Sequence, residues 1–240
     1  MKLHLNSKNF QTDFITPILE VIKDGRCAVF CENEEIYSVS VVNGLGVYLY
    51  NTYKPVKIEE PLPRFNVNLE KLKKGMLCIG NEFVDFDIEK SNLSYKDDTV
   101  KLSVRLLEDN SVNVVRFNVE TFKNFPFDFE MKIAVDDLVA LRRSINFAAD
   151  TTKFYLQQDE ESIYILFGDK QAQHSDSIRV FLTKEFKGTI GENIYDTAIL
   201  NLILKQKDDI HLKVSANGAL LMQIERGSST LRYITTKLKK

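Results

Sequence analysis

An internal repeat is the feature of this sequence that most constrains its fold. Met1–Leu5 and Met131–Val135 are similar short strand patterns, and each leads directly into a helical pattern. Self-similarity of this kind indicates one structural unit that the chain uses twice. We therefore compare the predicted order of elements in the two halves.

The first helix of each half is predicted from the spacing of apolar residues and from signals at the helix ends. Residues 7–16 place apolar side chains on one face, and Pro17 is expected to end this helix because proline has no backbone N–H to donate. Residues 136–147 form the matching helix of the second half, in which Asp136 is a suitable N-cap.

Strand patterns follow each of these helices. In the first half, Asp24-Gly25 predicts a hairpin over residues 19–30, because both residue types tolerate a positive φ angle. In the second half, residues 153–167 form the corresponding hairpin, which turns at Asp159-Glu160. An edge strand comes next, at residues 35–42 in the first half and 177–183 in the second. A second helix follows, at residues 69–77 and 195–206, and a three-stranded meander then closes each half.

The predicted fold class is α+β, with two pseudo-symmetric repeats of the order β-α-β-β-β-α-β-β-β. The first repeat covers residues 1–107, the second covers residues 131–240, and residues 108–130 form an inter-domain connector. Two helices in each repeat must cover one face of its antiparallel sheets. We therefore expect helices on one side and sheets on the other.

The composition is that of a globular chain without a strong overall charge. Of its residues, 44% are hydrophobic and 28% are charged, which excludes a disordered chain. The net charge of −2 argues against a protein that binds nucleic acid with its whole surface, but not against one that is basic on a single face. Apolar runs are too short for a membrane span or a signal peptide, so we expect a cytoplasmic protein. Cys27, Cys31 and Cys78 are odd in number and lack metal spacing, so we expect reduced thiols.

Segments spread over nearly the whole chain carry a family resemblance. They are Met1–Leu3 with the helix at 7–16, Phe125–Phe127 in the connector, Val135–Leu141, Asp176–Val180, Gly191–Asn193 and Ile203–Lys207. In this order and spacing they resemble the T4-type phage DNA sliding clamp, a DNA polymerase processivity factor. Residues 54–64 and Pro17 depart from the pattern of that family.

The resemblance implies a homotrimer of two-domain subunits that closes into a ring around double-stranded DNA. Sheets would form the outside of the ring, helices would line the hole, and subunits would meet head to tail through edge strands. It also implies two partners, a replicative DNA polymerase and a clamp loader ATPase. No cofactor, no metal and no membrane partner is predicted for this chain.

Lysine and arginine residues lie on the predicted helices, on the faces that turn away from the sheets. The residues predicted to face DNA are Lys8, Lys71, Lys73, Lys74, Arg142, Arg143, Lys205 and Lys207. The contacts would be to phosphates and independent of base sequence. A basic lining with an acidic exterior of strands and loops would reconcile DNA binding with the net charge. The alternative is that these cations form only the solvated faces of their helices.

The connector is rich in phenylalanine. Its aromatic residues are Phe117, Phe122, Phe125, Phe127 and Phe129, with Pro126 among them. Part of this region is predicted to border an apolar pocket for C-terminal peptides of the polymerase and the clamp loader. The alternative is that the rings only pack the two halves together.

Residues suited to catalysis or metal binding are scattered. His4, His174 and His211 have no metal spacing, and Asp85 and Asp87 are expected on the solvent side of a strand whose other side is apolar. No catalytic residue is therefore predicted. Two other functions stay open, namely a β-rich structural or virion-assembly protein with no DNA role, and a hydrolase that uses the two aspartates.

Overall fold

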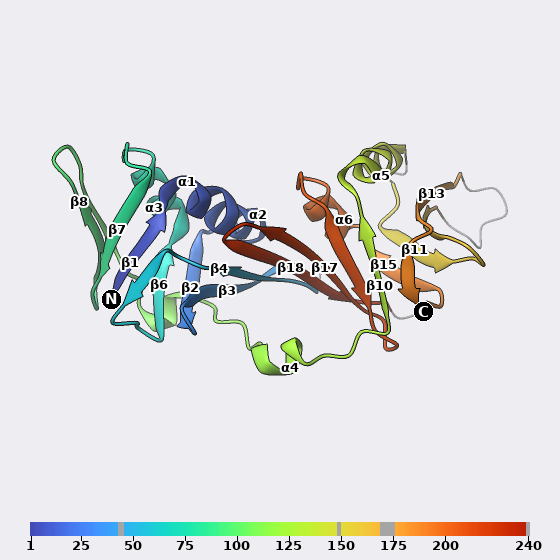
Figure 1. Cartoon of the computed structure of the whole chain (residues 1–240), viewed down its shortest axis with the longest axis horizontal. Coiled ribbons are helices and arrows are strands. Elements are labelled where there is room, and N and C mark those ends of the chain that lie inside the picture. Colours follow the sequence, from blue (N-terminus) through green and yellow to red (C-terminus); the bar gives the residue numbers. More distant parts are fainter. Residues whose placement is uncertain (43–45, 148–149, 169–175, 239–240) are drawn as a thin grey trace. The chain divides into compact units, whose positions relative to one another are not determined.

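Two compact units make up the chain in a computed structural model, which describes residues 1–42, 46–147, 150–168 and 176–238. Unit 1 comprises Met1–Val42, Leu49–Phe117 and Arg226–Leu231, and unit 2 is built chiefly from Asn118–Glu225 and Arg232–Lys240. Figure 1 shows the elements of both units in sequence colours. Within the residues described, no helix is long and apolar enough to cross a membrane.

The first repeat runs from β1 to β9. Its helical segments are α1 (Ser7–Asn9), the π-helical η1 (Phe10–Ile15), α2 (Thr16–Val21) and α3 (Leu69–Met76). Its strands are β1 (Lys2–Asn6), β2 (Arg26–Glu32), β3 (Glu35–Val42), β4 (Val47–Tyr53), β5 (Lys57–Glu59), β6 (Arg64–Asn68), β7 (Phe83–Ile88), β8 (Asn92–Lys96) and β9 (Lys101–Arg105).

The second repeat follows a stretch that contains the 3₁₀ turn η2 (Asp109–Ser111) and the short helix α4 (Val119–Lys123). Its helices are α5 (Val135–Phe147) and α6 (Ala198–Ile203). Its strands are β10 (Phe129–Ile133), β11 (Lys153–Gln158), β12 (Ile163–Phe167), β13 (Ile178–Thr183), β14 (Phe186–Gly188), β15 (Asn193–Asp196), β16 (Ile210–Val214), β17 (Ala219–Arg226) and β18 (Ser229–Thr236).

Strand pairing is the same in the two repeats, which confirms the predicted α+β fold with a repeated unit. β1 lies between β5 and β7, and the order continues through β8 to β9, while β10 lies between β14 and β16, and the order continues through β17 to β18. Likewise, β2 lies between β3 and β6 as β11 lies between β12 and β15. Each repeat also contains a pair of strands, β5 and β6 or β14 and β15, that the predicted order lacks.

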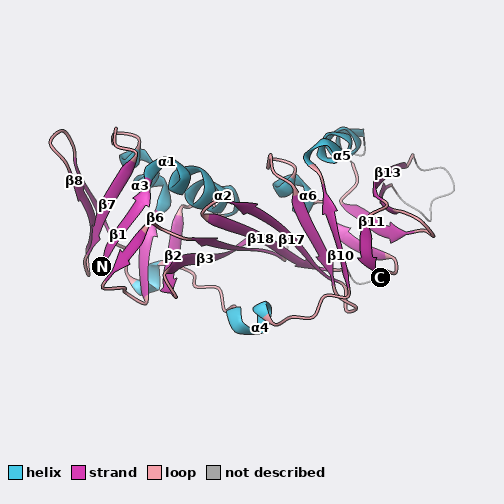
Figure 2. Cartoon of the chain, viewed as in Figure 1, coloured by secondary structure: helices cyan, strands magenta, loops and turns pink. Residues whose placement is uncertain are grey.

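Figure 2 shows α1, α2 and α3 on one side of the strands of unit 1, and α5 and α6 on one side of the strands of unit 2. In unit 1, the Lys73 ammonium on α3 donates to Thr16 Oγ1 at 2.9 Å, which ties α3 to the first helix. In unit 2, the Arg142 guanidinium on α5 donates to Leu204 O at 2.6 Å, at the end of α6. Each unit therefore displays a helix pair above its sheets.

Apolar periodicity explains how these elements form a core. In β7, Val84, Phe86 and Ile88 are buried, whereas Asp85 and Asp87 alternate with them on the exposed side. The buried residues of α3 are Leu69, Leu72 and Met76, which recur at helical spacing as predicted. Both periodicities direct apolar side chains to the interface between helix and sheet.

Pro17 does not end the first helix, contrary to the prediction. α1, η1 and α2 are consecutive, and Pro17 lies in the first turn of α2. The π-helical turns before it shift the bonding pattern, since the Thr16 N–H donates to Gln11 O, five residues earlier. A proline fits at such a junction because no intrahelical donor is needed there. Residues 19–23 are therefore not a strand, and Gly25 turns the chain from helix into β2 with φ +67°.

The boundaries of the later helices also differ from the predictions. α5 begins at Val135 rather than Asp136, and the Val135 N–H donates to Asp209 Oδ1 at 3.1 Å, so the acceptor comes from a distant segment. α6 is shorter than the predicted 195–206 because Asn193–Asp196 pairs as β15. Two edge strands were predicted, and β13 is one, whereas β3 lies between β2 and β4.

The boundaries of the two compact units differ from the predicted boundaries of the two repeats. Packing changes from unit 1 to unit 2 between Phe117 and Asn118, inside the predicted connector, and Arg226–Leu231 of the second half packs with unit 1. Because units defined by packing and repeats defined by pattern are different divisions, the limits 1–107, 108–130 and 131–240 stay predictions.

Candidate nucleic-acid interface and partner surfaces

The helix pair of unit 1 displays a group of lysines. Asn68 accepts a hydrogen bond from the Lys71 N–H at 2.9 Å and caps α3, which starts the helix so that its apolar residues face the core. Lys8, Lys71 and Lys74 are consequently exposed, whereas Lys73 is half-buried and bonded to Thr16 Oγ1. Three of the four predicted cations of this unit are thus free to meet an anion from solvent.

The cations of unit 2 are divided in the same way. Arg143 on α5 is exposed, but Arg142 is half-buried, and its Nε and Nη2 atoms donate to the carbonyl oxygens of Leu204 and Gln206 at 2.6 and 2.9 Å. Lys205 and Lys207 are exposed, although they lie beyond the last residue of α6 rather than on it. The predicted residues of this unit therefore come from one helix face and one turn.

The exposed side of α5 is more apolar than the prediction of a basic lining implies. Val135, Val139 and Phe147 are 36%, 42% and 59% exposed, and with Arg143 they recur at every fourth position of the helix. Residues four apart share a helix face, so the spacing of these exposed apolar residues can be recognised in the sequence.

Glu130, an acidic residue on a strand, is paired with lysines of two neighbouring strands. Glu130 on β10 lies within 3.3 Å of the Lys187 ammonium and 3.4 Å of the Lys213 ammonium, which together lower the pKa of this carboxyl below 4.5. The strands therefore carry both signs of charge. The contrast between a basic lining and an acidic exterior stays a prediction.

The aromatic residues of the connector fall into separate contacts. Phe117 packs against Tyr50 of unit 1, with ring centroids 5.6 Å apart. Phe125 and Phe127 of unit 2 meet edge to face at 5.3 Å, and both rings are half-buried, as is Phe122 on α4. Pro126 between them is exposed. Phe129 is fully buried as part of β10, so the half-buried rings are those available to a partner.

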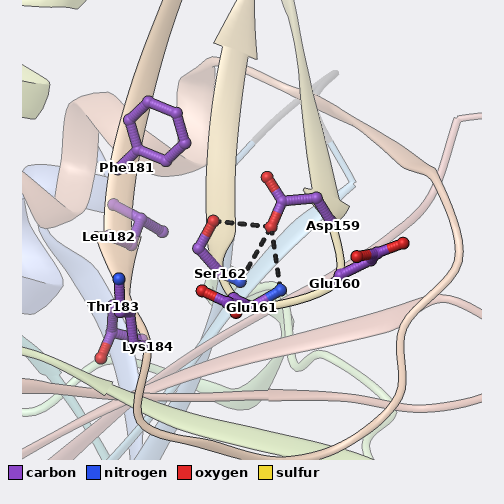
Figure 3. Close-up of a pocket in the computed structure, with 8 residues that line it drawn as sticks. All are labelled: Asp159, Glu160, Glu161, Ser162, Phe181, Leu182, Thr183 and Lys184. Atoms are coloured by element: carbon purple, nitrogen blue, oxygen red, sulfur yellow. Dashed lines mark hydrogen bonds between the residues drawn. The ribbon is translucent and has the colours of Figure 1, made fainter.

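Each unit also has a strand at a sheet edge, and the two edges differ in charge. β9 ends the sheet order of unit 1 and exposes Lys101 and Arg105. β13 ends the four-stranded sheet of unit 2 and exposes Phe181, at 59%, beside a shallow pocket (Figure 3). The other wall of that pocket is the β11–β12 turn, where Glu160 and Glu161 are exposed.

Among the residues that the structure describes, the candidate catalytic groups lie in separate places. Asp85 and Asp87 are on the exposed side of β7 as predicted, and His4 Nδ1 lies 2.7 Å from Asp85 Oδ1. Among the described residues, no group of three or more histidine, cysteine or acidic side chains could hold a metal ion. His174 lies outside the described residues. Cys27 is buried against Ser38, with Sγ and Oγ 2.9 Å apart, and Cys78 is exposed.

Comparison with known proteins identifies the fold. No protein-family model and no curated protein matches this chain. The structure of PCNA from A. fulgidus, bound to the C-terminal region of FEN-1, matches with a TM-score of 0.77 and 13% identity, and the match covers 100% of this chain and 98% of that one. Proliferating Cellular Nuclear Antigen from Entamoeba histolytica matches with a TM-score of 0.74 and 9% identity over 99% and 98% of the two chains.

A bacterial structure gives the same result. The DNA polymerase sliding clamp from Bacillus subtilis matches with a TM-score of 0.74 and 13% identity over 100% of this chain and 64% of that one. At such low identities the similarity defines the fold. The chain therefore has the sliding-clamp fold, with two repeats in one chain.

Proposed function

We propose that this chain is a DNA sliding clamp, a processivity factor that forms a ring around duplex DNA and holds the replicative DNA polymerase on it. The sliding-clamp fold over the whole chain is the observation that carries this proposal. The proposal also includes a likeness to the T4-type phage clamp, a homotrimeric ring and a clamp loader partner. It places the protein in the cytoplasm, which would be that of the host cell if the source is viral.

The proposed DNA contacts are the exposed cations of the helices and of the turn that follows α6. They are Lys8, Lys71, Lys74, Arg143, Lys205 and Lys207. Long, mobile ammonium side chains suit contacts to phosphates that must break and re-form as a ring slides, because such contacts need no fixed geometry and read no bases.

Charge reversal tests this interface. Lys71→Glu combined with Lys74→Glu should reduce processive synthesis by the cognate polymerase about tenfold or more, because phosphate attraction becomes repulsion. The same change at Lys54 and Lys90, which are exposed but lie outside the helices, is the matched control and should have little effect. Unchanged synthesis with the helix variant, or an equal loss with the control, would remove α3 from the interface.

Ring closure is proposed to use the two edge strands. Unpaired backbone groups on β9 of one copy would pair with those on β13 of the next, which removes both exposed edges. Lys101 and Arg105 would approach Glu160 and Glu161, and Phe181 would be buried. Such a contact joins different surfaces of two copies, so it forms a ring when the rotation closes.

The connector is proposed to bind C-terminal peptides of the polymerase and of the clamp loader. Phe122, Phe125 and Phe127 supply half-buried rings next to Pro126, and aromatic anchors of this kind dominate peptide binding. Phe117, which packs on Tyr50 in unit 1, stays a predicted partner-binding residue of that unit.

Removal of the two paired rings tests this surface. Phe125→Ala with Phe127→Ala should weaken polymerase binding by about 2 kcal/mol, the size of one anchor residue, while DNA retention changes little. Phe83→Ala is the control, because Phe83 is also a surface phenylalanine, 47% exposed, but lies on β7. Equal polymerase affinity of the connector variant and the parent would exclude the connector as the binding surface.

A further inference from the structure

Arg142 differs from every other cation predicted to face DNA, because its guanidinium is committed to backbone oxygens. Its Nε atom donates to Leu204 O at 2.6 Å, and its Nη2 atom donates to Gln206 O at 2.9 Å. The side chain is half-buried between α5 and the turn that follows α6. Arg143, the next residue, is exposed.

The carbonyl groups of Leu204 and Gln206 lie on either side of Lys205, and Gln206 immediately precedes Lys207. The last carbonyl groups of a helix lack intrahelical donors, and they form the negative end of the helix dipole. Without a cation, these oxygens would repel a phosphate that approached the adjacent lysines. A guanidinium that binds both oxygens cancels this repulsion and also fixes the backbone on both sides of Lys205.

Other contacts hold the same turn from different directions. Gln206, which is 5% exposed, donates from Nε2 to Leu202 O and to the Tyr233 hydroxyl, both at 3.3 Å. At the other end of the turn, Asp209 binds the Val135 N–H at 3.1 Å and the Lys132 ammonium at 2.6 Å. Lys205 and Lys207 are left pointing to solvent, and neither has an ion-pair partner among the described residues. The turn is thus a rigid support for two free ammonium groups.

We propose that Arg142 is a positioning residue of the DNA interface, which holds the turn at Leu204–Lys207 so that Lys205 and Lys207 meet phosphates. This rests on the proposed clamp function. Arg142 acts through the two lysines and does not contact DNA itself. An arginine is required because its planar fork reaches two carbonyl oxygens at once, whereas a lysine ammonium supplies the charge without that geometry.

A double-mutant cycle separates action through the lysines from direct contact. The affinity of the full chain for a fluorescent linear duplex of mixed sequence is measured over a salt series for the parent, Arg142→Gln, Lys205→Gln/Lys207→Gln and their combination. Arg142→Gln should weaken binding severalfold in the parent background and less than about twofold when both lysines are absent, because residues that act as a unit are non-additive. Arg143→Gln is the matched control and should cause the same fold-change in both backgrounds.

Hydrogen exchange supplies a readout that does not depend on DNA. Arg142→Gln should accelerate exchange of the Leu204 and Gln206 amides, which donate to Leu200 O and Ile203 O at 2.8 Å, and leave those of α3 unchanged. Arg142→Lys should accelerate exchange at these two amides nearly as much. A normal exchange rate in Arg142→Gln, or an equal loss of DNA affinity with and without the lysines, would overturn the proposal. A parent chain that shows no retention on closed circular DNA would overturn the clamp function as well, whereas retention without coupling would overturn only the role of Arg142.

Discussion

A single carboxylate, Asp97, organises the β8–β9 turn. It accepts hydrogen bonds from the Tyr95 hydroxyl at 2.7 Å, the Thr99 N–H at 2.7 Å and the Val100 N–H at 2.6 Å. These bonds favour the ionised form and hold the pKa of Asp97 well below 3.8. Because β9 is the edge strand proposed to meet a second copy, this residue supports the geometry of the ring contact.

Replacement of Asp97 tests this role through the pH dependence of stability. A lowered folded-state pKa contributes stability that is present above the unfolded pKa and is lost as the pH falls through the folded value. Asp97→Asn should therefore unfold at a lower temperature than the parent at pH 7, and the difference should shrink as the pH falls below 3.8. Thermal unfolding at several pH values measures this, with Asp98→Asn as the control. A difference independent of pH would contradict the assignment.

The sequence predicts only in part which basic side chains of a helix are exposed and not bonded to other groups of the protein. The sequence identifies all of the basic residues, but Lys73 and Lys74, or Arg142 and Arg143, are adjacent, and consecutive helical residues point about 100° apart. Their different fates depend on the neighbouring helix, which supplies Thr16 Oγ1 in one unit and the carbonyl oxygens of Leu204 and Gln206 in the other. Acceptors that come from a distant part of the chain cannot be predicted from the spacing of residues within one helix.

At the level of elements, each unit has an exposed strand at a sheet edge. β13 is bounded by one neighbour, and its Phe181 faces solvent beside the β11–β12 turn. β9 has the same position at the end of its own sheet and carries basic residues. Exposed edge strands can pair with another chain, which is why ring closure is proposed to use β9 and β13.

The edge strand β13 therefore provides a test of assembly. Phe181→Asp should leave the monomer folded, because the side chain is already mostly exposed, and should reduce the native mass from about three chains to the 27.6 kDa of one. Phe83→Asp is the control, since β7 lies between β1 and β8. Native mass spectrometry distinguishes these outcomes, and an unchanged mass for Phe181→Asp would exclude β13 from the contact.

Elements with strong local signals are those that the sequence predicts well. Asn68 marks the start of α3, and Asp159 marks the β11–β12 turn through bonds to the Ser162 N–H and hydroxyl. The three-residue strands β5 and β14 were not predicted, because such short strands form only by pairing with β1 and β10. The helix through Pro17 was missed because a π-helical turn changes which N–H groups are needed.

For the whole molecule, the order in which strands pair is shared more widely among similar structures than the identity of the residues. The two repeats share one strand order, and solved sliding clamps share the fold at 9–13% identity. Apolar alternation and helix periodicity can be satisfied by many sequences, so a fold survives where individual residues change. In the proposed function, retention on DNA depends on topology, because a closed ring would hold DNA without tight contacts.

Topological retention tests the central claim most directly. The chain is loaded onto nicked circular DNA with its cognate loader, separated from free protein by gel filtration in high salt, and the plasmid is then cut once with a restriction enzyme. A ring should remain with the circle in high salt, because salt screens phosphate contacts but does not open the ring, and it should leave after the cut by sliding off the ends. Loss of the protein from the intact circle in high salt, or its persistence on the cut DNA, would contradict the account.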